Sequence, residues 1–478
     1  MTDFTLSFKP AIGPYGAHDP SAVIFQDGEV VYAVEEERLI REKHATGTFP
    51  EQSIRACLDY CGISLSDVDT VVLPYNPRLQ LKNVQVDFRR RLSRGSSALD
   101  RLQSLERFVE QYVGARFRPT IDVKRALRRI NTPIPPISLR SHHACHASSA
   151  FHPSPFDNAL VLTIDGKGEY DSTVIWEGTG DGVDRIRTYE FPNSLGHFYG
   201  IITEFLGYRS FNGEGKVMGL APYGDDVSEI ESTLRSCIDT GIDYDVTPIT
   251  GEGIETGVKT IEELFGRKRN DTPGEFTQWE RDLAYAVQNL LEETVTDIIE
   301  VYSSRLGINN VCLAGGVALN CKMNKRVMEH EMVESVYIQP VANDAGLPLG
   351  AGWIDQRPAD VQVMDNVYLG PSFKREKVER ILKQKKIPYT EPESLIADVA
   401  KRLANGELVG WFQGKLELGP RALGNRSILA DPRTIDSRDR VNKYVKHREE
   451  WRPFAPSIIE SAAGDYLENA ESSSFMIK

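Results

Sequence analysis

The sequence is poor in cysteine and contains no long apolar run. Six of its 478 residues are cysteines, and they lack the paired spacing that zinc ribbons use. We therefore expect no disulfide framework and a reducing, cytoplasmic location. No apolar stretch approaches the length of a transmembrane helix, and the first residues lack the regions of a signal peptide, so no membrane partner is expected.

Positive charge is also in deficit, with 56 basic against 69 acidic residues and a net charge of −13. Such a chain repels phosphate backbones, which disfavours nucleic acid as a partner. The exception is the segment 89–129, which has a helical pattern and is unusually basic. It is either a hairpin of helices with solvated charged faces or an insertion that steers an anionic ligand. Its cations are Arg89, Arg90, Arg91, Arg94, Arg101, Arg107, Arg116, Arg118, Lys124, Arg125, Arg128 and Arg129.

A short repeat indicates how the chain is organised. Residues 21–25 and 172–176 are similar apolar strands, each preceded by an acid-containing loop. Each is followed by a turn, at 26–28 and at 177–178, as in a β-hairpin. A buried strand at 160–164 precedes the second copy. The repeat predicts two related α/β lobes that face each other across a cleft.

The later elements extend this pattern. An apolar stripe predicts a helix over 279–306 that ends at Gly307, followed by strands at 311–314 and near 336–339 and a helix from Ala318. The length of the chain favours two or three domains. Prolines and glycines place a domain boundary within 355–373. Helices at 374–384 and 394–405 and a strand at 408–412 predict another α/β unit, and 472–478 has the pattern of a strand.

Three histidines in five residues form the sharpest local feature. On a helix, His142 and His146 lie one turn apart on one face, a spacing that suits two metal-binding imidazoles. A hydrogen-bonded helix start is the equal alternative. Asp344 is a candidate oxygen ligand, or else a helix N-cap. Histidine and aspartate ligands with open positions suit iron, manganese or zinc.

Three glycine-bearing turns are candidates for nucleotide binding. Asp165 and Gly166 follow a buried strand, Lys216 lies among glycines, and Gly315-Gly316 leads toward Asn320 at a strand-to-helix junction. Backbone amides at such a junction favour anions. Each turn alone is commonplace, but together they predict a nucleotide in the cleft between the lobes.

The C-terminal unit concentrates cations in a loop broken by glycine and proline. Arginine forks match phosphate oxygens, so this cluster predicts a pocket for a phosphate ester. The alternative is surface ion pairing with Glu417, Glu449 and Glu450. The cations are Lys415, Arg421, Arg426, Lys446, Arg448 and Arg452.

At these motifs the chain resembles the NodU/CmcH-type O-carbamoyltransferases. The matching stretches occur in order along almost the whole sequence: 18–22, 35–38, 142–147, 165–169, 213–224, 315–320, 343–346, 419–429 and 452–456. The resemblance implies a two-lobed actin/Hsp70/sugar-kinase-like (Kae1-like) domain over 1–356, with lobes of about 1–155 and 156–356. It implies a YrdC-like α/β domain over 373–478, expected to be incomplete because family members usually continue further. Lys415 stands where the family often has arginine.

The resemblance also implies a reaction. The YrdC-like domain would use ATP, with Mg²⁺, and carbamoyl phosphate to form carbamoyl adenylate, and the Kae1-like domain would transfer the carbamoyl group to an acceptor hydroxyl. His142, His146 and Asp344 would hold a divalent metal, iron by analogy, and Asp19 would position or deprotonate the acceptor. Gly316 and Asn320 would meet the adenosine, and the C-terminal cations would hold the phosphates. A homodimer is left open.

Three alternatives remain at this point. A tRNA threonylcarbamoyl transferase-like enzyme shares the Kae1-like lobe, although the net charge of −13 argues against an RNA substrate. A non-catalytic nucleotide-binding protein is the second alternative, because the YrdC-like domain is expected to be incomplete. A sugar or acetate kinase from the same superfamily is the third.

Overall fold

A computed structural model describes residues 2–82, 84, 88, 98–117, 119–356, 363–449, 451–468 and 472–478. The chain divides into two compact units, residues 1–364 and 365–478, which we describe separately. Among the described residues, no helix combines the length and the apolar character needed to cross a bilayer.

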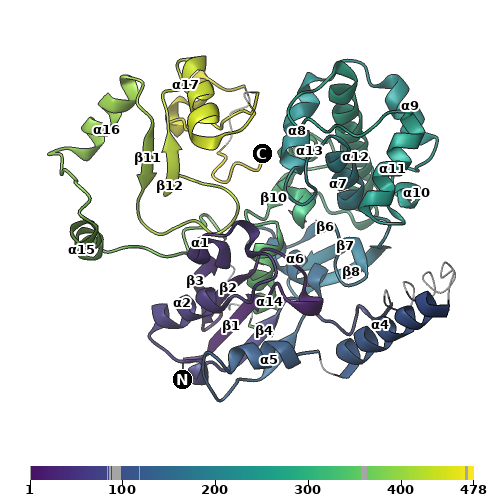
Figure 1. The fold of residues 1–478 in the computed structure, drawn as a ribbon, viewed down its shortest axis with the longest axis horizontal. Helices are drawn as coiled ribbons and strands as arrows, with labels where there is room; N and C mark the ends of the chain where they lie inside the picture. Colours follow the sequence, from purple (N-terminus) through teal and green to yellow (C-terminus); the bar gives the residue numbers. More distant parts are fainter. Residues whose placement is uncertain are drawn as a thin grey trace. The chain divides into compact units, whose positions relative to one another are not determined.

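The first sheet of residues 1–364 has five strands in the order β3-β2-β1-β4-β5 (Figure 1). β1, β2 and β3 are antiparallel neighbours, whereas β1, β4 and β5 run parallel. A tight turn joins β2 to β3, so the hairpin predicted at 21–28 is confirmed. The strands are β1 (Phe4–Lys9), β2 (Ser21–Gln26), β3 (Glu29–Glu35), β4 (Thr70–Leu73) and β5 (Ile137–Leu139).

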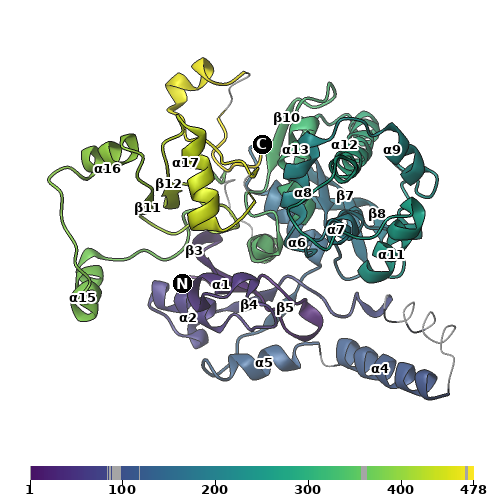
Figure 2. The same ribbon diagram turned by 45° about the horizontal axis from the view of Figure 1, so that its top comes forward.

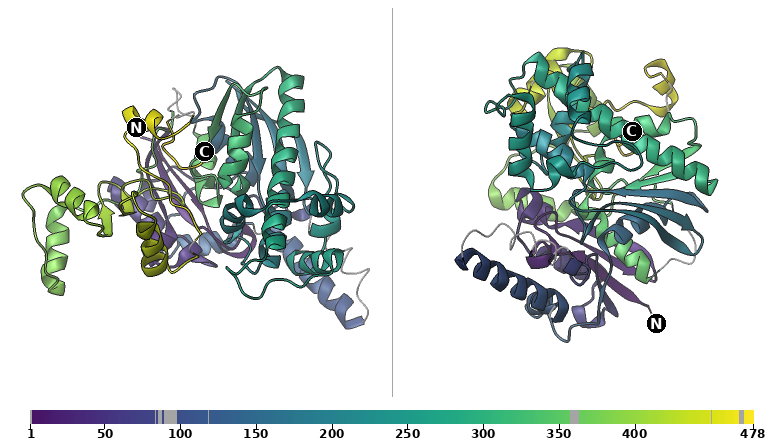
Figure 3. Two further views of the ribbon diagram at one scale, coloured as in Figure 1. Left: turned by 90° about the horizontal axis from the view of Figure 1, so that it is seen from above. Right: turned by 90° about the vertical axis from the view of Figure 1, so that its right-hand side faces the viewer.

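The second sheet repeats this plan, with the order β10-β9-β6-β7-β8. β6, β7 and β8 are antiparallel neighbours, whereas β9 and β10 run parallel to β6, as in the first sheet (Figures 1 and 3). The repeat, the α/β class and the two-lobed architecture expected from the sequence are therefore confirmed. The strands are β6 (Ala159–Ile164), β7 (Asp171–Thr179), β8 (Gly182–Glu190), β9 (Asn310–Ala314) and β10 (Ser335–Ile338).

One turn was predicted wrongly. The expected turn at 177–178 lies inside β7, where Glu177 and Gly178 pair with Asp184 and Val183 of β8. The chain reverses only after Thr179. Glycine is suited to position 178 because the ring of Phe151 packs directly over it.

Two helices exchange places between the lobes. α6 (His142–Phe151) follows β5 of the first sheet but packs on the second, where Ala147, Ala150 and Phe151 join its apolar core. α14 (Leu347–Asp355) follows β10 but packs on the first sheet, beneath β1, β2 and β4. The two helices also pack against each other. They therefore lie between the sheets and bind the lobes together.

The predicted long helix is confirmed as α12 (Gln278–Leu306), and Gly307 ends it in a left-handed conformation. Its predicted apolar stripe is buried. A capping box between Thr277 and Glu280, which the sequence analysis missed, starts the helix. The helix expected from Ala318 begins later, at Cys321, because a 3-10 turn over Gly316–Leu319 comes first.

The other α-helices in the described part of residues 1–364 complete the two lobes (Figure 2). They are α1 (Glu36–Ile40), α2 (Glu51–Cys61), α4 (Ala98–Phe117), α5 (Ile121–Leu127), α7 (Leu195–Phe205), α8 (Glu214–Leu220), α9 (Ser228–Arg235), α10 (Thr247–Thr250), α11 (Ile254–Phe265) and α13 (Cys321–Met328). The basic segment is helical where it is described, in α4 and α5. Arg89, Arg90, Arg91, Arg94 and Arg118 lie outside the described residues.

Residues 365–478 contain the predicted helices α15 (Arg375–Lys385) and α16 (Leu395–Ala404) and the strand β11 (Val409–Phe412). β11 pairs with β12 (Arg426–Leu429), and α17 (Ile435–Arg440) and a π-helical turn (Val441–Lys446) follow. The strand predicted at 472–478 is wrong. Those residues form a turn, because Met476 has a positive φ of 55° that is incompatible with an extended chain.

Candidate active site

Four side chains from both lobes converge between the two sheets: His142, His146, Asp165 and Asp344. One ligand atom of each lies within 4.8 Å of those of the others. The two histidines project from α6, Asp165 follows the end of β6, and Asp344 precedes α14. The predicted pair on one helix face is present, with ring centroids 4.7 Å apart. Asp165, which the sequence suggested for nucleotide binding, joins the same cluster.

The distances leave His146 without a hydrogen bond. His142 Nε2 lies 2.9 Å from Asp165 Oδ2, whereas His146 Nε2 lies 3.7 Å from both Asp165 Oδ2 and Asp344 Oδ1. Among the described residues, neither ring nitrogen of this fully buried histidine has a hydrogen-bond partner. Buried polar atoms are normally satisfied. Two imidazoles and two carboxylates with unmet bonding capacity therefore fit a divalent metal ion.

The charges in the cluster stabilise one another. Although burial alone would lower it, Asp344 and Asp165 raise the pKa of His142 to about 9. Burial disfavours the ionisation of both carboxyl groups. The histidines nevertheless lower the pKa of Asp165, and Lys9 and His142 lower the pKa of Asp344. Both carboxyl groups are therefore ionised, the form that binds a cation.

Two supporting residues were missed by the sequence analysis. Lys9, at the end of β1, is buried, and its Nζ lies 3.1 Å from Asp344 Oδ2. Glu169 is buried and accepts hydrogen bonds from the backbone N–H groups of His142 and Asn76. Burial raises the pKa of Glu169 to about 7. Glu169 thus accepts a hydrogen bond from the first N–H group of α6. The histidine motif therefore also forms the hydrogen-bonded helix start that was the alternative.

Close packing of α6 on α14 brings the ligands from the two helices together. A Cβ atom on Gly350 would lie 1.8 Å from the carbonyl oxygen of Cys145. Any larger residue at 350 would therefore push the helices apart. Cys145 also packs against Leu347 and Ala351 of α14. Glycine at this position fixes the separation between the histidines and Asp344.

A second polar group surrounds Asp19, in the loop between β1 and β2. Its Oδ2 lies 3.0 Å from His18 Nδ1, and its Oδ1 lies 2.8 Å from His44 Nδ1. Burial opposes ionisation, but the two histidines lower the pKa of Asp19. Asn343, the neighbour of Asp344, is 3.5 Å away, and Lys9 donates to the carbonyl of His18. The Asp19 group is thus connected to the metal-binding candidates.

The backbone around Asp19 is strained. Asp19, His44 and Phe211 all have positive φ angles, of 54°, 63° and 62°. Such angles are uncommon outside glycine and concentrate at functional sites. The Phe211 ring lies 5.8 Å from that of His18 and is half exposed. This group therefore has the strain and partial exposure of a binding site.

The nucleotide-binding candidates are distributed along the second lobe. The N–H of Gly316 donates to Asp165 Oδ1 at 3.1 Å, so the Gly315-Gly316 turn adjoins the cluster. Gly315 has a φ of 90°, and a Cβ there would lie 2.3 Å from the carbonyl of Ile164.

The other nucleotide-binding candidates are Asn320, Gly166 and Lys216, also in the second lobe. Asn320 caps α13 and forms hydrogen bonds with Gln288 of α12. Gly166 lies beside His197 and Phe211, and Lys216 in α8 lies over the ring of Tyr208.

In residues 365–478, several predicted cations lie close together. Partial burial and the charges of Arg448, Arg452 and Arg426 lower the pKa of Lys446. Arg426 also pairs with Glu417 and Arg452 with Glu449, as the alternative of ion pairing expected, although Glu417 is buried and not on the surface. The phosphate pocket stays a prediction. Glu417 is buried and accepts N–H groups from Leu423, Asn425 and Arg426, which shapes the loop. Lys415 and Arg421 lie in that loop, and Glu450 lies outside the described residues.

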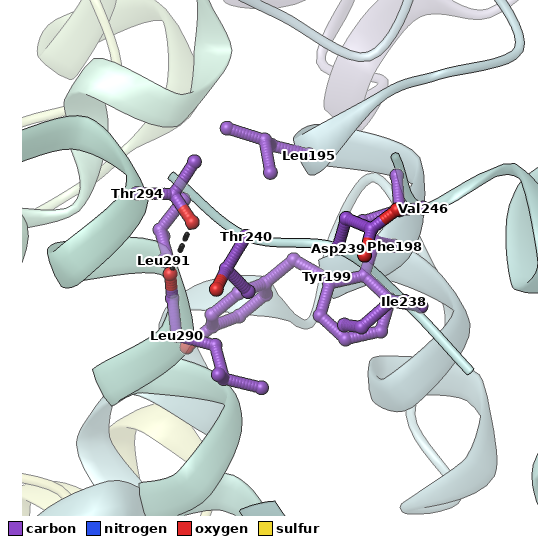
Figure 4. A pocket seen from close by; sticks show the side chains of 10 residues that line it. All are labelled: Leu195, Phe198, Tyr199, Ile238, Asp239, Thr240, Val246, Leu290, Leu291 and Thr294. Carbon is purple, nitrogen blue, oxygen red and sulfur yellow. Dashed lines mark hydrogen bonds between the residues drawn. The ribbon is translucent and has the colours of Figure 1, made fainter. Parts of the chain in front are cut away.

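A small pocket in the second lobe lies among core residues (Figure 4). Leu195, Phe198 and Tyr199 of α7 and Leu290, Leu291 and Thr294 of α12 line it. Its lining is mainly apolar and includes none of the four residues of the His/Asp cluster. We therefore assign it to the core.

Comparison with known proteins identifies the family. The family model for the carbamoyltransferase N-terminus matches residues 12–353, and that for the carbamoyltransferase C-terminus matches residues 400–478. An uncharacterised Synechocystis protein is 36% identical over 96% of this chain and 77% of its own length. The nodulation protein NolNO of Sinorhizobium fredii is 36% identical over 95% of this chain and 64% of its own length.

A shorter match is to the 3'-hydroxymethylcephem-O-carbamoyltransferase of Streptomyces clavuligerus, 38% identical over 30% of this chain and 27% of the relative. Among solved structures, full-length HypF in its phosphate- and nucleotide-bound form has 13% identity and a TM-score of 0.42, over 76% of this chain and 56% of HypF. The resemblance seen in the sequence motifs is confirmed by the two family models and the curated relatives. The chain belongs to the carbamoyltransferase family.

Proposed function

We propose that the protein transfers a carbamoyl group to a hydroxyl group of a small-molecule or sugar-containing acceptor. Carbamoyl phosphate and ATP, with Mg²⁺, would supply the group as carbamoyl adenylate. The observation that carries the proposal is the His142/His146/Asp165/Asp344 cluster, in which the histidines are buried and the carboxylates partly buried. Such a cluster would hold a cation within a chain of the carbamoyltransferase family, and transfer from an adenylate releases an anion.

The transfer step follows from charge and bonding. The acceptor oxygen attacks the carbamoyl carbon. The bond between that carbon and the phosphate oxygen of AMP breaks, and AMP leaves with the electron pair. A divalent metal held by the cluster would supply positive charge near the departing phosphate. Gly316 and Asn320 would bind the adenosine. Gly166 and Lys216, in the same lobe, are the further candidates for nucleotide binding.

The acceptor proton needs a base, and we propose a division of labour between Asp19 and His18. Asp19 has both carboxylate oxygens engaged and a lowered pKa, so it is a weak proton acceptor. When His18 Nδ1 donates to Asp19, His18 Nε2 is left to accept a proton, and this side chain is 37% exposed. Asp19 would then orient the imidazole, a positioning role.

Residues 365–478 would contribute to adenylate formation as part of a YrdC-like domain. The cations around Lys446 support this assignment, because clustered charge that already lowers the pKa of a lysine favours an anion. Lys415, Arg421, Arg426, Arg448 and Arg452 would bind carbamoyl phosphate and the phosphates of ATP.

Two measurements test the proposal. Carbamoyl-phosphate-dependent exchange of pyrophosphate into ATP tests adenylate formation, and mass spectrometry of hydroxyl-bearing acceptors tests transfer. The metal site is tested separately by elemental analysis of His146→Ala, with His330→Ala, a partly buried histidine outside the cluster, as the matched control. We expect metal loss only in His146→Ala. Absence of any carbamoylated product with a metal-loaded protein and authentic carbamoyl adenylate would refute the transfer function.

A further inference from the structure

Helix α4 exposes a continuous apolar stripe. Leu102, Leu105, Val109, Val113 and Phe117 follow one another at spacings of three and four residues, so they share one side of the helix. Their exposed fractions are 62%, 46%, 48%, 37% and 70%. Soluble proteins seldom leave so many large apolar side chains together in water.

This stripe is not the surface by which α4 attaches to its neighbours. The ring of Phe108 stacks on Phe88 with centroids 4.3 Å apart, and Tyr112 lies beside Phe108. Ala115, on the same side, is buried. α4 therefore has one apolar side that packs within the protein and a second that is exposed.

Positive charge follows the stripe along the chain. α5 and the residues after it expose Lys124, Arg125, Arg128 and Arg129, of which Arg125 pairs with Asp122 at 3.3 Å. Lys124 and Arg128 also line an open groove with residues 132–137. In the sequence, residues 85–130 contain twelve basic and five acidic side chains, a net charge of +7 in a chain of −13. α5 lies against the first lobe, and α4 lies farther out, beyond the end of α5 (Figures 1 and 2).

We propose that α4 and α5 dock the protein on an anionic phospholipid surface. The α4 stripe would enter the boundary between headgroups and acyl chains, and the cations would contact lipid phosphates. The expectation of no membrane partner rested on the lack of a spanning segment, which a helix lying in the interface does not require.

Charge and composition favour this occupant over two others. A second copy of the chain would bring two segments of +7 together, which is repulsive. Nucleic acid would bind the cations, but five exposed apolar side chains add nothing to contacts with phosphates. A surface that is both anionic and apolar beneath its headgroups matches both features.

Sedimentation of the full chain with vesicles tests the proposal. We expect binding to phosphatidylcholine vesicles that contain phosphatidylglycerol, weakening with salt, and little binding to phosphatidylcholine alone. The double variant Val109→Glu/Phe117→Glu should abolish binding. Ile186→Glu, a matched change at an exposed apolar residue of β8, should not affect it. Lys124→Gln/Arg128→Gln should weaken binding about fivefold per cation removed.

Other outcomes would overturn the proposal. These are equal binding to both kinds of vesicle, no binding by the unmodified protein, or retained binding by the α4 variant. A dimer that the α4 variant dissociates, without vesicle binding, would assign the stripe to self-association. Binding of RNA but not vesicles would assign the cations to nucleic acid. The comparison of vesicle types uses only the unmodified protein, so it stands even if a variant fails to fold.

Discussion

Lys9 forms a buried ion pair with Asp344, with 3.1 Å between Nζ and Oδ2. The pair joins the first strand of the chain to the candidate metal ligand that precedes α14. A cation in this position neutralises the carboxylate when no metal is bound.

Replacing Lys9 with methionine should destabilise the metal-free protein more than the metal-bound one. Removing one partner of a buried pair leaves an uncompensated charge, which costs about 3 kcal/mol. A divalent metal would compensate the same charge, and metal bound only to the folded state adds stability. Urea unfolding with chelator and with metal measures both values. Lys325→Met, which breaks an exposed pair with Glu329, is the control and should change stability by under about 1 kcal/mol. An equal loss in both states would contradict the predicted role of Lys9.

Asp165→Asn separates two roles for that residue. If Asp165 is a metal ligand, as its 2.9 Å and 3.7 Å distances to the two histidines suggest, metal affinity should fall at least about tenfold. Elemental analysis and calorimetric titration with AMP provide the two readouts. Asp157→Asn, an exposed residue of the same lobe, is the control. Unchanged metal content with weakened AMP binding would return Asp165 to nucleotide binding alone.

The Asp19 group predicts a pH-dependent stability. Asp19 raises the pKa values of His44 and, against burial, of His18 above their ordinary 6.5, and they in turn lower its pKa below 3.8. Lys9 and Lys43 nearby oppose protonation of the histidines, whereas Asp344 favours protonation of His18. The ion pairs therefore stabilise the folded protein fully between pH 3.8 and pH 6.5, and they weaken on either side of this range.

Asp19→Asn tests this pH dependence. The difference in unfolding free energy between the unmodified protein and Asp19→Asn should be largest between pH 3.8 and 6.5. It should shrink as the pH rises through the raised pKa values of the histidines, because neutral rings no longer pair with the carboxylate. Chemical denaturation across this range measures it, and His44→Gln should remove part of the effect. A difference that stays constant with pH would show that Asp19 stabilises through hydrogen bonds alone.

Gly350→Ala should lower stability by about 1–3 kcal/mol, because the added methyl group meets the Cys145 carbonyl at 1.8 Å. Thermal unfolding measures the loss. Gly114→Ala is the matched control, since nothing lies within 4 Å of a Cβ there, and alanine in a helix should be neutral or stabilising. The Gly350 variant should also bind metal less tightly, because α6 and α14 would separate. Full stability in Gly350→Ala would mean that the two helices can readjust.

Local patterns predicted much of this structure. The apolar stripe defined α12 to within one residue at its start, and the spacing of His142 and His146 placed both rings on one side of α6. The repeat also predicted the two related hairpins, although it placed the turn of the second one too early in the chain. Each of these features depends on residues that are close together in the sequence.

The rest depends on contacts between distant segments. Nothing near Lys9 indicates a buried lysine, because its partner lies 335 positions later in the chain. Asp165 had the signature of a glycine turn, and only the fold brings it to the histidines. A hint was available in the repeat, since Asp19 and Asp165 both lie in the loop that joins the first two strands of a lobe.

The exchange of α6 and α14 has a consequence for dissecting the protein. Each helix is encoded with one lobe but completes the core of the other. A fragment cut between the lobes, near residue 155, would leave α6 without the sheet that covers Ala147, Ala150 and Phe151, and the first sheet without α14. Neither half should form a stable domain alone, and complementation would require the two fragments to fold around each other.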